Sequence, residues 1–258
     1  MESILSELKN SVLYVRLNRA KVFNSFNREM ALSLQSVLKD AAENKEVRAI
    51  VIQGEGRAFC AGQDLQEVTD PNGPDLTDIV MEHYNPIIQL IRQVEKPIIA
   101  AVNGVAAGAG ANIALACDIV LATESASFIQ AFSKIGLIPD SAGTFFLPRL
   151  IGFQKASALM MMGDKVKAKE AEAMGMIYKA VADDSFADEV VKTAEYLAAM
   201  PTYGLGLTKR ALNQSYQNDL NAQLNLEGEL QTAAAKSYDY NEGVSAFLEK
   251  RRPEFKGE

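Results

Sequence analysis

The longest uncharged stretch of the chain lies near its middle and limits the folds that the sequence can adopt. It runs from Pro97 to Cys117 and is long enough to cross a bilayer as a helix. However, Asn103 and Asn112 lie within it, and three glycines between residues 104 and 110 interrupt it. This arrangement is typical of a buried strand, a glycine turn and the start of a buried helix, so we predict these elements and no membrane span.

Short apolar segments alternate with helical patterns on both sides of this stretch. We expect strands at 12–17, 49–52, 97–102 and 119–121, with 4–8 as the hairpin partner of the first strand. We expect helices at 28–43, capped by Asn27, and at 79–94, interrupted near Pro86. Because strands and helices that alternate at this spacing form parallel crossovers, the sequence predicts an α/β fold.

The pattern becomes mostly helical after Gly152. We expect separate helices at 168–174, 185–199, 205–215 and 220–235, with a break at Met200 and Pro201. The chain is therefore expected to consist of an α/β core over residues 1–200 and a C-terminal helical region over residues 201–258.

Charge and rare residue types argue against several classes of function. The 258 residues include 26 Lys and Arg against 33 Asp and Glu, and this net charge of −7 disfavours nucleic acid and anionic membranes as partners. Two cysteines and one histidine, His83, exclude a disulfide framework and a multi-histidine metal site. We expect no metal or redox cofactor. The first residues lack the basic segment of a signal peptide, so we expect a cytoplasmic protein.

Three clusters rich in glycine or other small residues could carry chemistry, at 54–65, 103–112 and 136–144. The first follows a predicted parallel strand, where α/β folds bind ligands, although a tight turn explains it as well. The second could open a helix whose N–H groups hold a developing negative charge. A dinucleotide turn at Gly108 and Gly110 is the weaker interpretation, because Ile113 stands where the third glycine belongs. In the third, Asp140 is either a helix N-cap or a carboxylate placed for proton transfer.

These clusters, in this order, resemble motifs of the enoyl-CoA hydratase/isomerase family, the crotonases. The resemblance covers nearly the whole chain and rests on residues 17–19 with 24–26, 58–65, 102–110, 116–119 and 242–251. It implies the crotonase (ClpP-like) fold, with repeated ββα units, a parallel sheet and a C-terminal helical trimerisation region. It also implies an acyl-CoA substrate, of which coenzyme A is a part, and a homo-oligomer that is a trimer or a dimer of trimers.

The resemblance implies catalytic roles for three residues. The backbone N–H groups of Gln63 and Ala109 would bind the thioester carbonyl oxygen and stabilise an enolate. The two glutamates of crotonase hydratases would fall at Asn112 and Phe132, which cannot exchange a proton near neutral pH. Asp140 remains as the acid/base, and one carboxylate that moves a proton between two carbons is isomerase chemistry.

The residues around Asp140 and on the last helix narrow the resemblance to those family members that isomerise ring 1,2-epoxyphenylacetyl-CoA in phenylacetate degradation and shift double bonds of enoyl-CoAs. The alternatives are hydration, dehalogenation, C–C bond chemistry or acyl-CoA binding without catalysis. Some dehalogenases of the family use a histidine to activate water, and His83 lies in roughly the region of that histidine, although a single helical histidine is more often inert.

Eight further positions match substrate-binding positions of the family, and we expect them to contact the acyl-CoA. They are Ala20, Val22, Ala61, Asp64, Leu65, Phe132, Phe247 and Lys250. Phe247 and Lys250 would contact the adenine and the phosphates, in some relatives from a neighbouring subunit. The alternative for Lys250 is a solvated helix face beside Arg251 and Arg252.

Overall fold

A six-stranded sheet forms the centre of the computed structural model, which describes residues 2–258. Its order is β1-β2-β3-β5-β7-β10, and only β1 runs antiparallel to its neighbour, as the predicted hairpin requires. The strands are β1 (Ile4–Lys9), β2 (Val12–Leu17), β3 (Ala49–Gly54), β5 (Ile98–Val102), β7 (Ile119–Thr123) and β10 (Lys179–Val181). The predicted α/β fold and its four parallel strands are confirmed.

A second sheet of three-residue strands lies at one end of the first and was missed by the sequence prediction. Its order is β4 (Ala58–Cys60), β6 (Val105–Ala107), β8 (Ser127–Ile129) and β9 (Lys165–Lys167). Each of β3, β5 and β7 is followed by one of these short strands, which gives the repeated β-β-helix units. Strands β9 and β10 also interrupt the part predicted as mostly helical, because three residues are too few to show a period-two pattern.

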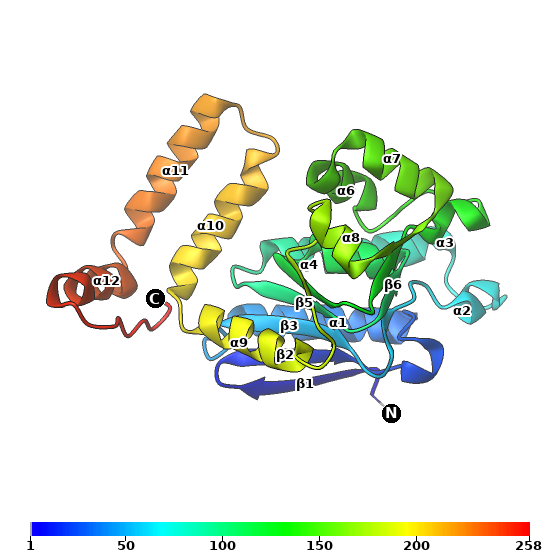
Figure 1. Cartoon of the computed structure of the whole chain (residues 1–258), viewed down its shortest axis with the longest axis horizontal. Coiled ribbons are helices and arrows are strands. Elements are labelled where there is room, and N and C mark those ends of the chain that lie inside the picture. Colours follow the sequence, from blue (N-terminus) through cyan, green and yellow to red (C-terminus); the bar gives the residue numbers. More distant parts are fainter. Residues whose placement is uncertain (1) are drawn as a thin grey trace.

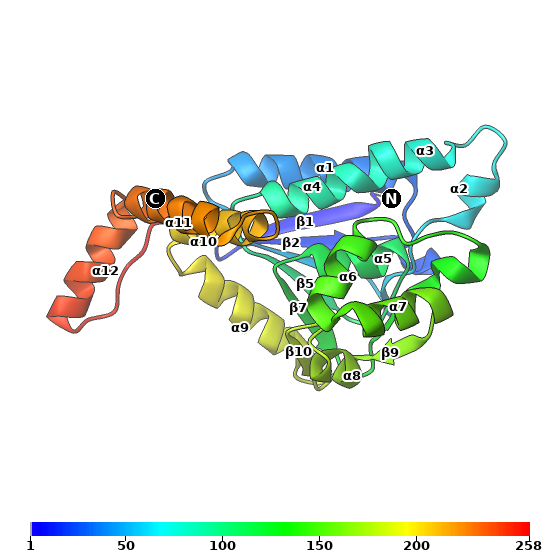
Figure 2. The ribbon, with the colours of Figure 1, turned by 90° about the horizontal axis from the view of Figure 1, so that it is seen from above.

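Both faces of the large sheet are buried, and alternating residues of β3 show how. Ile50 and Ile52 pack in the core beneath α1 (Arg28–Glu43) and α4 (Asn85–Gln93). Ala49 and Val51 point to the other face, which α9 (Phe186–Ala198) covers. Figure 2 shows α1 and α4 on one side of the sheet and α9 on the other. Burial on both faces explains why these strands appear in the sequence as continuous apolar runs.

The helices predicted at 28–43 and 79–94 are present, with two local features. Asn27 Oδ1 accepts a hydrogen bond from the Met30 N–H at 3.1 Å, so it caps α1 as expected. The predicted interruption near Pro86 is a π-helical segment, η2 (Ile79–Tyr84), that leads into α4. The other core helices are η1 (Ala20–Val22), α2 (Leu65–Thr69), α3 (Leu76–Asp78), α5 (Ala109–Ala116), η3 (Ala131–Ile135), α6 (Gly143–Ile151), α7 (Phe153–Met162) and α8 (Ala168–Ala173).

Residues 97–117 contain β5, β6 and the buried helix α5. This confirms the strand, turn and helix predicted there. Within residues 2–258, no helix has the length and apolar character needed to cross a bilayer.

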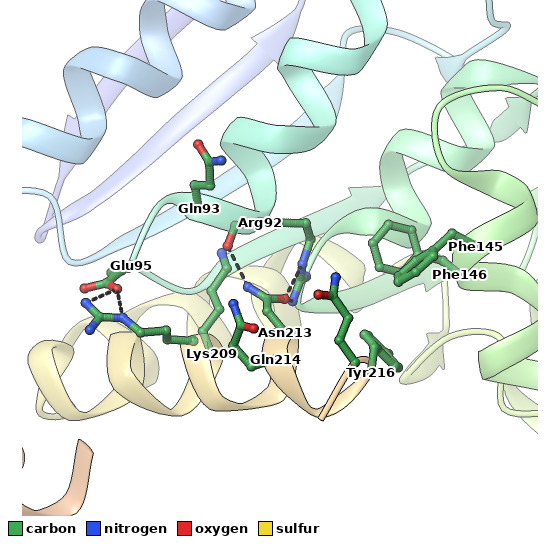
Figure 3. A pocket seen from close by; sticks show the side chains of 11 residues that line it. Arg92, Gln93, Glu95, Phe145, Phe146, Lys209, Asn213, Gln214 and Tyr216 are labelled. Atoms are coloured by element: carbon green, nitrogen blue, oxygen red, sulfur yellow. Dashed lines mark hydrogen bonds and ion pairs between the residues drawn. The ribbon is translucent and has the colours of Figure 1, made fainter. Parts of the chain in front are cut away.

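Three helices follow Pro201 and extend away from the sheet, as Figure 1 shows. They are α10 (Thr202–Ser215), α11 (Leu220–Ala234) and α12 (Tyr238–Glu249). The C-terminal half of α10 is joined to the core by a polar junction, which Figure 3 shows from close by. There Arg92 on α4 donates to Asn213 Oδ1 at 2.9 and 2.6 Å, and the Asn213 amide donates back to the Arg92 carbonyl at 2.8 Å.

Candidate active site

Two glycine turns bring the first two sequence clusters together. Gly62 has φ +93°, and a side chain there would lie 3.0 Å from the Ala107 carbonyl oxygen and 3.6 Å from the Ala109 nitrogen. Gly110 on α5 packs against Cys60 so closely that an added Cβ would lie 2.6 Å from Sγ. Because no side chain separates the two backbones, Gln63 and Ala109 lie on neighbouring turns.

The backbone N–H groups of Gln63 and Ala109 are free to bind a ligand. Within residues 2–258 neither donates a hydrogen bond to another group of the chain. Ala109 is the first residue of α5, and its N-cap, Gly108, has no side chain to satisfy the first turn. Helix-start N–H groups carry partial positive charge, so this pair of donors suits an oxygen that gains negative charge. The arrangement fits the predicted role of both residues.

Two residues that the sequence analysis missed hold the side-chain amide of Gln63, one at its oxygen and one at its nitrogen. The Tyr84 hydroxyl donates to Gln63 Oε1 at 2.8 Å, and Gln63 Nε2 donates to Glu67 Oε2 at 2.9 Å. Tyr84 is buried, and burial raises its pKa well above the ordinary value. It lies in η2, and no local pattern showed that this helix would reach the turn at Gln63.

Asp140 lies in a turn between η3 and α6. The residues after it, Ser141 and Ala142, have φ of +50° and +57°. Because α6 begins at Gly143 with Ala142 as its N-cap and without a side-chain cap, the N-cap interpretation of Asp140 is wrong. Ser141 Oγ donates to Asp140 Oδ1 at 2.9 Å. Asp140 forms no ion pair with any residue of the described chain, and burial raises its pKa above the ordinary value.

The two positions that lack the hydratase glutamates lie beside this turn. Asn112, one helical turn after Ala109 on α5, donates from Nδ2 to the Asp140 carbonyl oxygen at 2.9 Å. Phe132 is buried, and its ring lies 3.7 Å from the point where a Cβ on Gly108 would be. The structure thus joins Ala109, Phe132 and Asp140 around the start of α5.

The predicted contacts on the first cluster lie at the same edge of the molecule. Ala20 and Val22 lie on η1, where Ala20 is exposed and Val22 is half-buried. Ala61 and Leu65 are exposed on either side of Gln63. Their exposure is compatible with the predicted contacts.

Asp64 differs from these neighbours because its carboxylate is already engaged. It pairs with Arg19 at 2.8 Å, and Oδ1 accepts from the Gln66 N–H at 3.0 Å as the N-cap of α2. The structure therefore assigns its side chain to holding the loop.

Phe247 and Lys250 are not brought to this site within one chain. Both lie at the end of α12, and Phe247 is 82% exposed. Figure 1 and Figure 2 show α12 at the end of the molecule opposite α2 and α3, which flank the Gln63 turn.

His83 and the cavity beside α10 are separate from the site. His83 is buried at 1% exposure, and its Nε2 lies 3.2 Å from an Arg28 guanidinium nitrogen. Burial lowers its pKa. The cavity of about 350 Å³ between α4, α6 and α10 is lined by side chains that mostly bind one another, including Arg92 and Asn213 (Figure 3).

Comparison with known proteins agrees with this geometry. The family model described as "Enoyl-CoA hydratase/isomerase" matches residues 7–258. The chain belongs to the enoyl-CoA hydratase/isomerase family. It is 48% identical to 1,2-epoxyphenylacetyl-CoA isomerase of Escherichia coli K12, over 100% of this chain and 99% of that protein. It is 43% identical to a probable enoyl-CoA hydratase of Rhodobacter capsulatus, over 99% of this chain and 98% of that protein.

Solved structures of the enoyl-CoA hydratase/isomerase family share the fold. An enoyl-CoA hydratase from Bacillus anthracis superposes with a TM-score of 0.93 at 32% identity, over 99% of this chain and 100% of that one. The expected crotonase fold with its C-terminal helical region is therefore confirmed. The chain is an enzyme of a family that comprises acyl-CoA isomerases and hydratases.

Proposed function

We propose that this crotonase isomerises unsaturated acyl-CoA thioesters, with Asp140 as the acid/base and ring 1,2-epoxyphenylacetyl-CoA as its physiological substrate in phenylacetate degradation. The observation that carries the proposal is the setting of Asp140. It is a carboxylate with a raised pKa and no cationic partner in the described chain, on a turn bound to the helix that begins at Ala109. The 48% identity to 1,2-epoxyphenylacetyl-CoA isomerase supports the choice of substrate.

The chemistry follows from two free N–H groups and one carboxylate. The Gln63 and Ala109 N–H groups bind the thioester oxygen, and each such donor contributes about 3 kcal/mol to stabilising the enolate. Asp140 removes a proton from one carbon and returns it to another. In an enoyl-CoA the double bond moves between these carbons, and in the ring epoxide the carbon–carbon bond shared by the two rings breaks to give the oxepin, so the product has the atoms of the substrate. No electrons leave the acyl group, so the proposed reaction needs no redox cofactor, and the expected absence of a metal stays a prediction. Buried Phe132 limits access of water to the acyl group.

Hydration is the second candidate, because the Rhodobacter relative carries a hydratase name. Water addition uses one group to activate water and one to deliver a proton. Asn112 and Phe132 supply neither, and Asp140 alone has the setting of an acid/base. The proposal therefore ranks isomerisation above hydration, and above acyl-CoA binding without turnover.

The two reactions differ by one water in product mass. Purified protein is mixed with ring 1,2-epoxyphenylacetyl-CoA, a 3-enoyl-CoA and crotonyl-CoA, and the products are followed by absorbance and mass spectrometry. We expect an unchanged mass with a new chromophore for the first two. A gain of one water on crotonyl-CoA would replace the proposal by the hydratase, and tight binding without turnover of any thioester would replace it by a binding protein.

The exposed end of α12 supports a second proposal, a homo-oligomer in which Phe247 and Lys250 meet the site of another subunit. Phe247 and Leu248 are 82% and 74% exposed in the single chain, and α11 has no buried residue. We propose a trimer or a dimer of trimers. Sedimentation velocity is expected to give the mass of a trimer or a hexamer, and Phe247→Asp is expected to lower it. A monomer at micromolar concentration would contradict this. The cytoplasmic location stays a prediction.

A further inference from the structure

Two buried amides connect the core of the fold to the Asp140 turn. Gln130 Nε2 donates to Asn112 Oδ1 at 2.8 Å, and Asn112 Nδ2 donates to the Asp140 carbonyl oxygen at 2.9 Å. Both side chains are buried, with Asn112 1% and Gln130 4% exposed. They come from α5 and from the residue before η3, so the chain of bonds crosses three segments.

This chain of hydrogen bonds has one direction. The Asp140 carbonyl oxygen can only accept, so the Asn112 group that faces it must be the donor Nδ2. Asn112 Oδ1 then faces Gln130 and requires a donor, which fixes the Gln130 amide as well. Reversing either amide would place two acceptors face to face in a buried site. The position of the Asp140 backbone is thus coupled to both amides.

The turn needs such support because its backbone is unfavourable by itself. Ser141 and Ala142 both have positive φ, which residues with side chains rarely adopt. Gly143 N–H also donates to the Asp140 carbonyl at 2.9 Å. Gly143 lies against the Asn112 amide, where an added Cβ would come within 2.3 Å of Nδ2. The Asn112 amide therefore contacts both ends of the strained segment.

We infer that Asn112 and Gln130 are positioning residues that hold the Asp140 carboxylate in its partly buried place for proton transfer. The role of this placement in proton transfer rests on the proposed function, but the placement of the carboxylate itself can be tested without substrate. Neither amide gains or loses a proton in the reaction. A misplacement of the reacting group by about 1 Å can cost about 100-fold in rate. We therefore expect substitutions of these two amides to lower kcat.

The test compares Asn112→Ala, Gln130→Met and the double variant. Asn112→Ala is expected to lower kcat by about 10- to 100-fold with little change in KM, and Gln130→Met by less. Because Gln130 acts through Asn112, the double variant should be no slower than Asn112→Ala. Cys117→Ala, at the other end of α5 and buried without contact to Asp140, is the matched control for loss of stability. Equal losses in the control, or losses that add in the double variant, would overturn the inference.

A second measurement separates this inference from the proposed function. The 13C signal of the Asp140 carboxyl is assigned by its absence in Asp140→Asn and followed against pH, with no substrate present. Burial raises the Asp140 pKa, so release of the turn in Asn112→Ala should lower it toward 3.8. An unchanged titration would refute the positioning role even if the enzyme isomerises thioesters. A shifted titration would support it even if the wild type turns over none of them.

Discussion

Asp118 and Asp140 are both partly buried aspartates, and they differ in how their charge is compensated. Asp118, just before β7, contacts Arg92 at 3.0 Å and Lys209 at 2.7 Å and accepts the Ile98 N–H at 2.9 Å. Asp140 receives one side-chain hydrogen bond, from Ser141, and no cation from the described chain. Asp118 joins α10 to the core through Arg92 and Lys209, which Figure 3 shows, whereas Asp140 lies on a turn bound to α5, the helix that begins at Ala109.

This difference distinguishes a carboxylate that holds the fold together from one that can take part in proton transfer. The Asp118 carboxylate is engaged by two cations and a backbone N–H, and these contacts hold α10 against the core. A buried carboxylate without a cation has a raised pKa and can both accept and return a proton. The fold therefore uses the same residue type for docking a helix and for the proposed catalysis.

Removal of the Asp118 charge is expected to have the largest effect on stability. The Lys209 side chain is 6% exposed, and burial lowers its pKa even beside Asp118. Asp118→Asn would leave this ammonium without its carboxylate, which we expect to cost about 3 kcal/mol of unfolding free energy. Urea unfolding followed by circular dichroism measures the loss.

Two further variants sharpen that prediction. Adding Lys209→Met to Asp118→Asn removes the uncompensated charge and should recover much of the lost stability. Glu124→Gln breaks an exposed pair with Lys169 and should change the unfolding free energy by less than about 0.5 kcal/mol. An Asp118→Asn protein as stable as Glu124→Gln would show that Asp118 is not the structural member of the comparison.

The raised pKa of Asp140 predicts where activity is lost in acid. The base must be ionised to take a proton, so kcat/KM should fall about tenfold per pH unit below its pKa. Because burial raises that pKa, the acidic limb should lie above the ordinary carboxyl value of 3.8. The pH profile of isomerisation, measured where circular dichroism shows the protein folded, checks this. A limb at the ordinary value would mean that Asp140 is solvated during turnover.

The stability of Asp140→Asn should depend on pH in the opposite sense to that of a paired carboxylate. A native pKa above the unfolded value means that protonation stabilises the fold, and that this contribution is lost as pH rises through the native pKa. The variant should thus match the wild type below about pH 3.8 and exceed its stability near pH 7. Lower stability than the wild type at pH 7 would show that the ionised Asp140 stabilises the native protein.

Ser141→Ala is expected to have the smallest effect. The Ser141 hydroxyl stabilises the ionised Asp140, so its removal should raise the Asp140 pKa further and move the acidic limb of kcat/KM to higher pH. Ser125→Ala, in an exposed turn, should leave the limb in place. A limb that moves to lower pH in Ser141→Ala would contradict the assignment.

The sequence predicted the strands of the large sheet except β10, because β-branched and apolar residues run continuously through strands such as β3 and β5. It missed the three-residue strands, such as β9, because so short a segment shows no period. Gln63 and Ala109 were predicted as site residues from a motif resemblance. The close contacts of Gly62 and Gly110 explain why the motif places their two turns side by side. The Tyr84 and Gln130 contacts depend on tertiary packing of distant segments, for which one sequence has no signal.

The most direct test of the account is single-turnover isomerisation of a 3-enoyl-CoA in D2O by wild type, Asp140→Asn and Asp118→Asn. We expect the wild type to shift the double bond without adding water, with deuterium entering only as far as the Asp140 proton exchanges with solvent before its return, and folded Asp118→Asn to do the same. Asp140→Asn should bind the thioester with similar affinity and isomerise it at least about 100-fold more slowly. Isomerisation by Asp140→Asn at the wild-type rate would contradict the assignment of Asp140 as the acid/base.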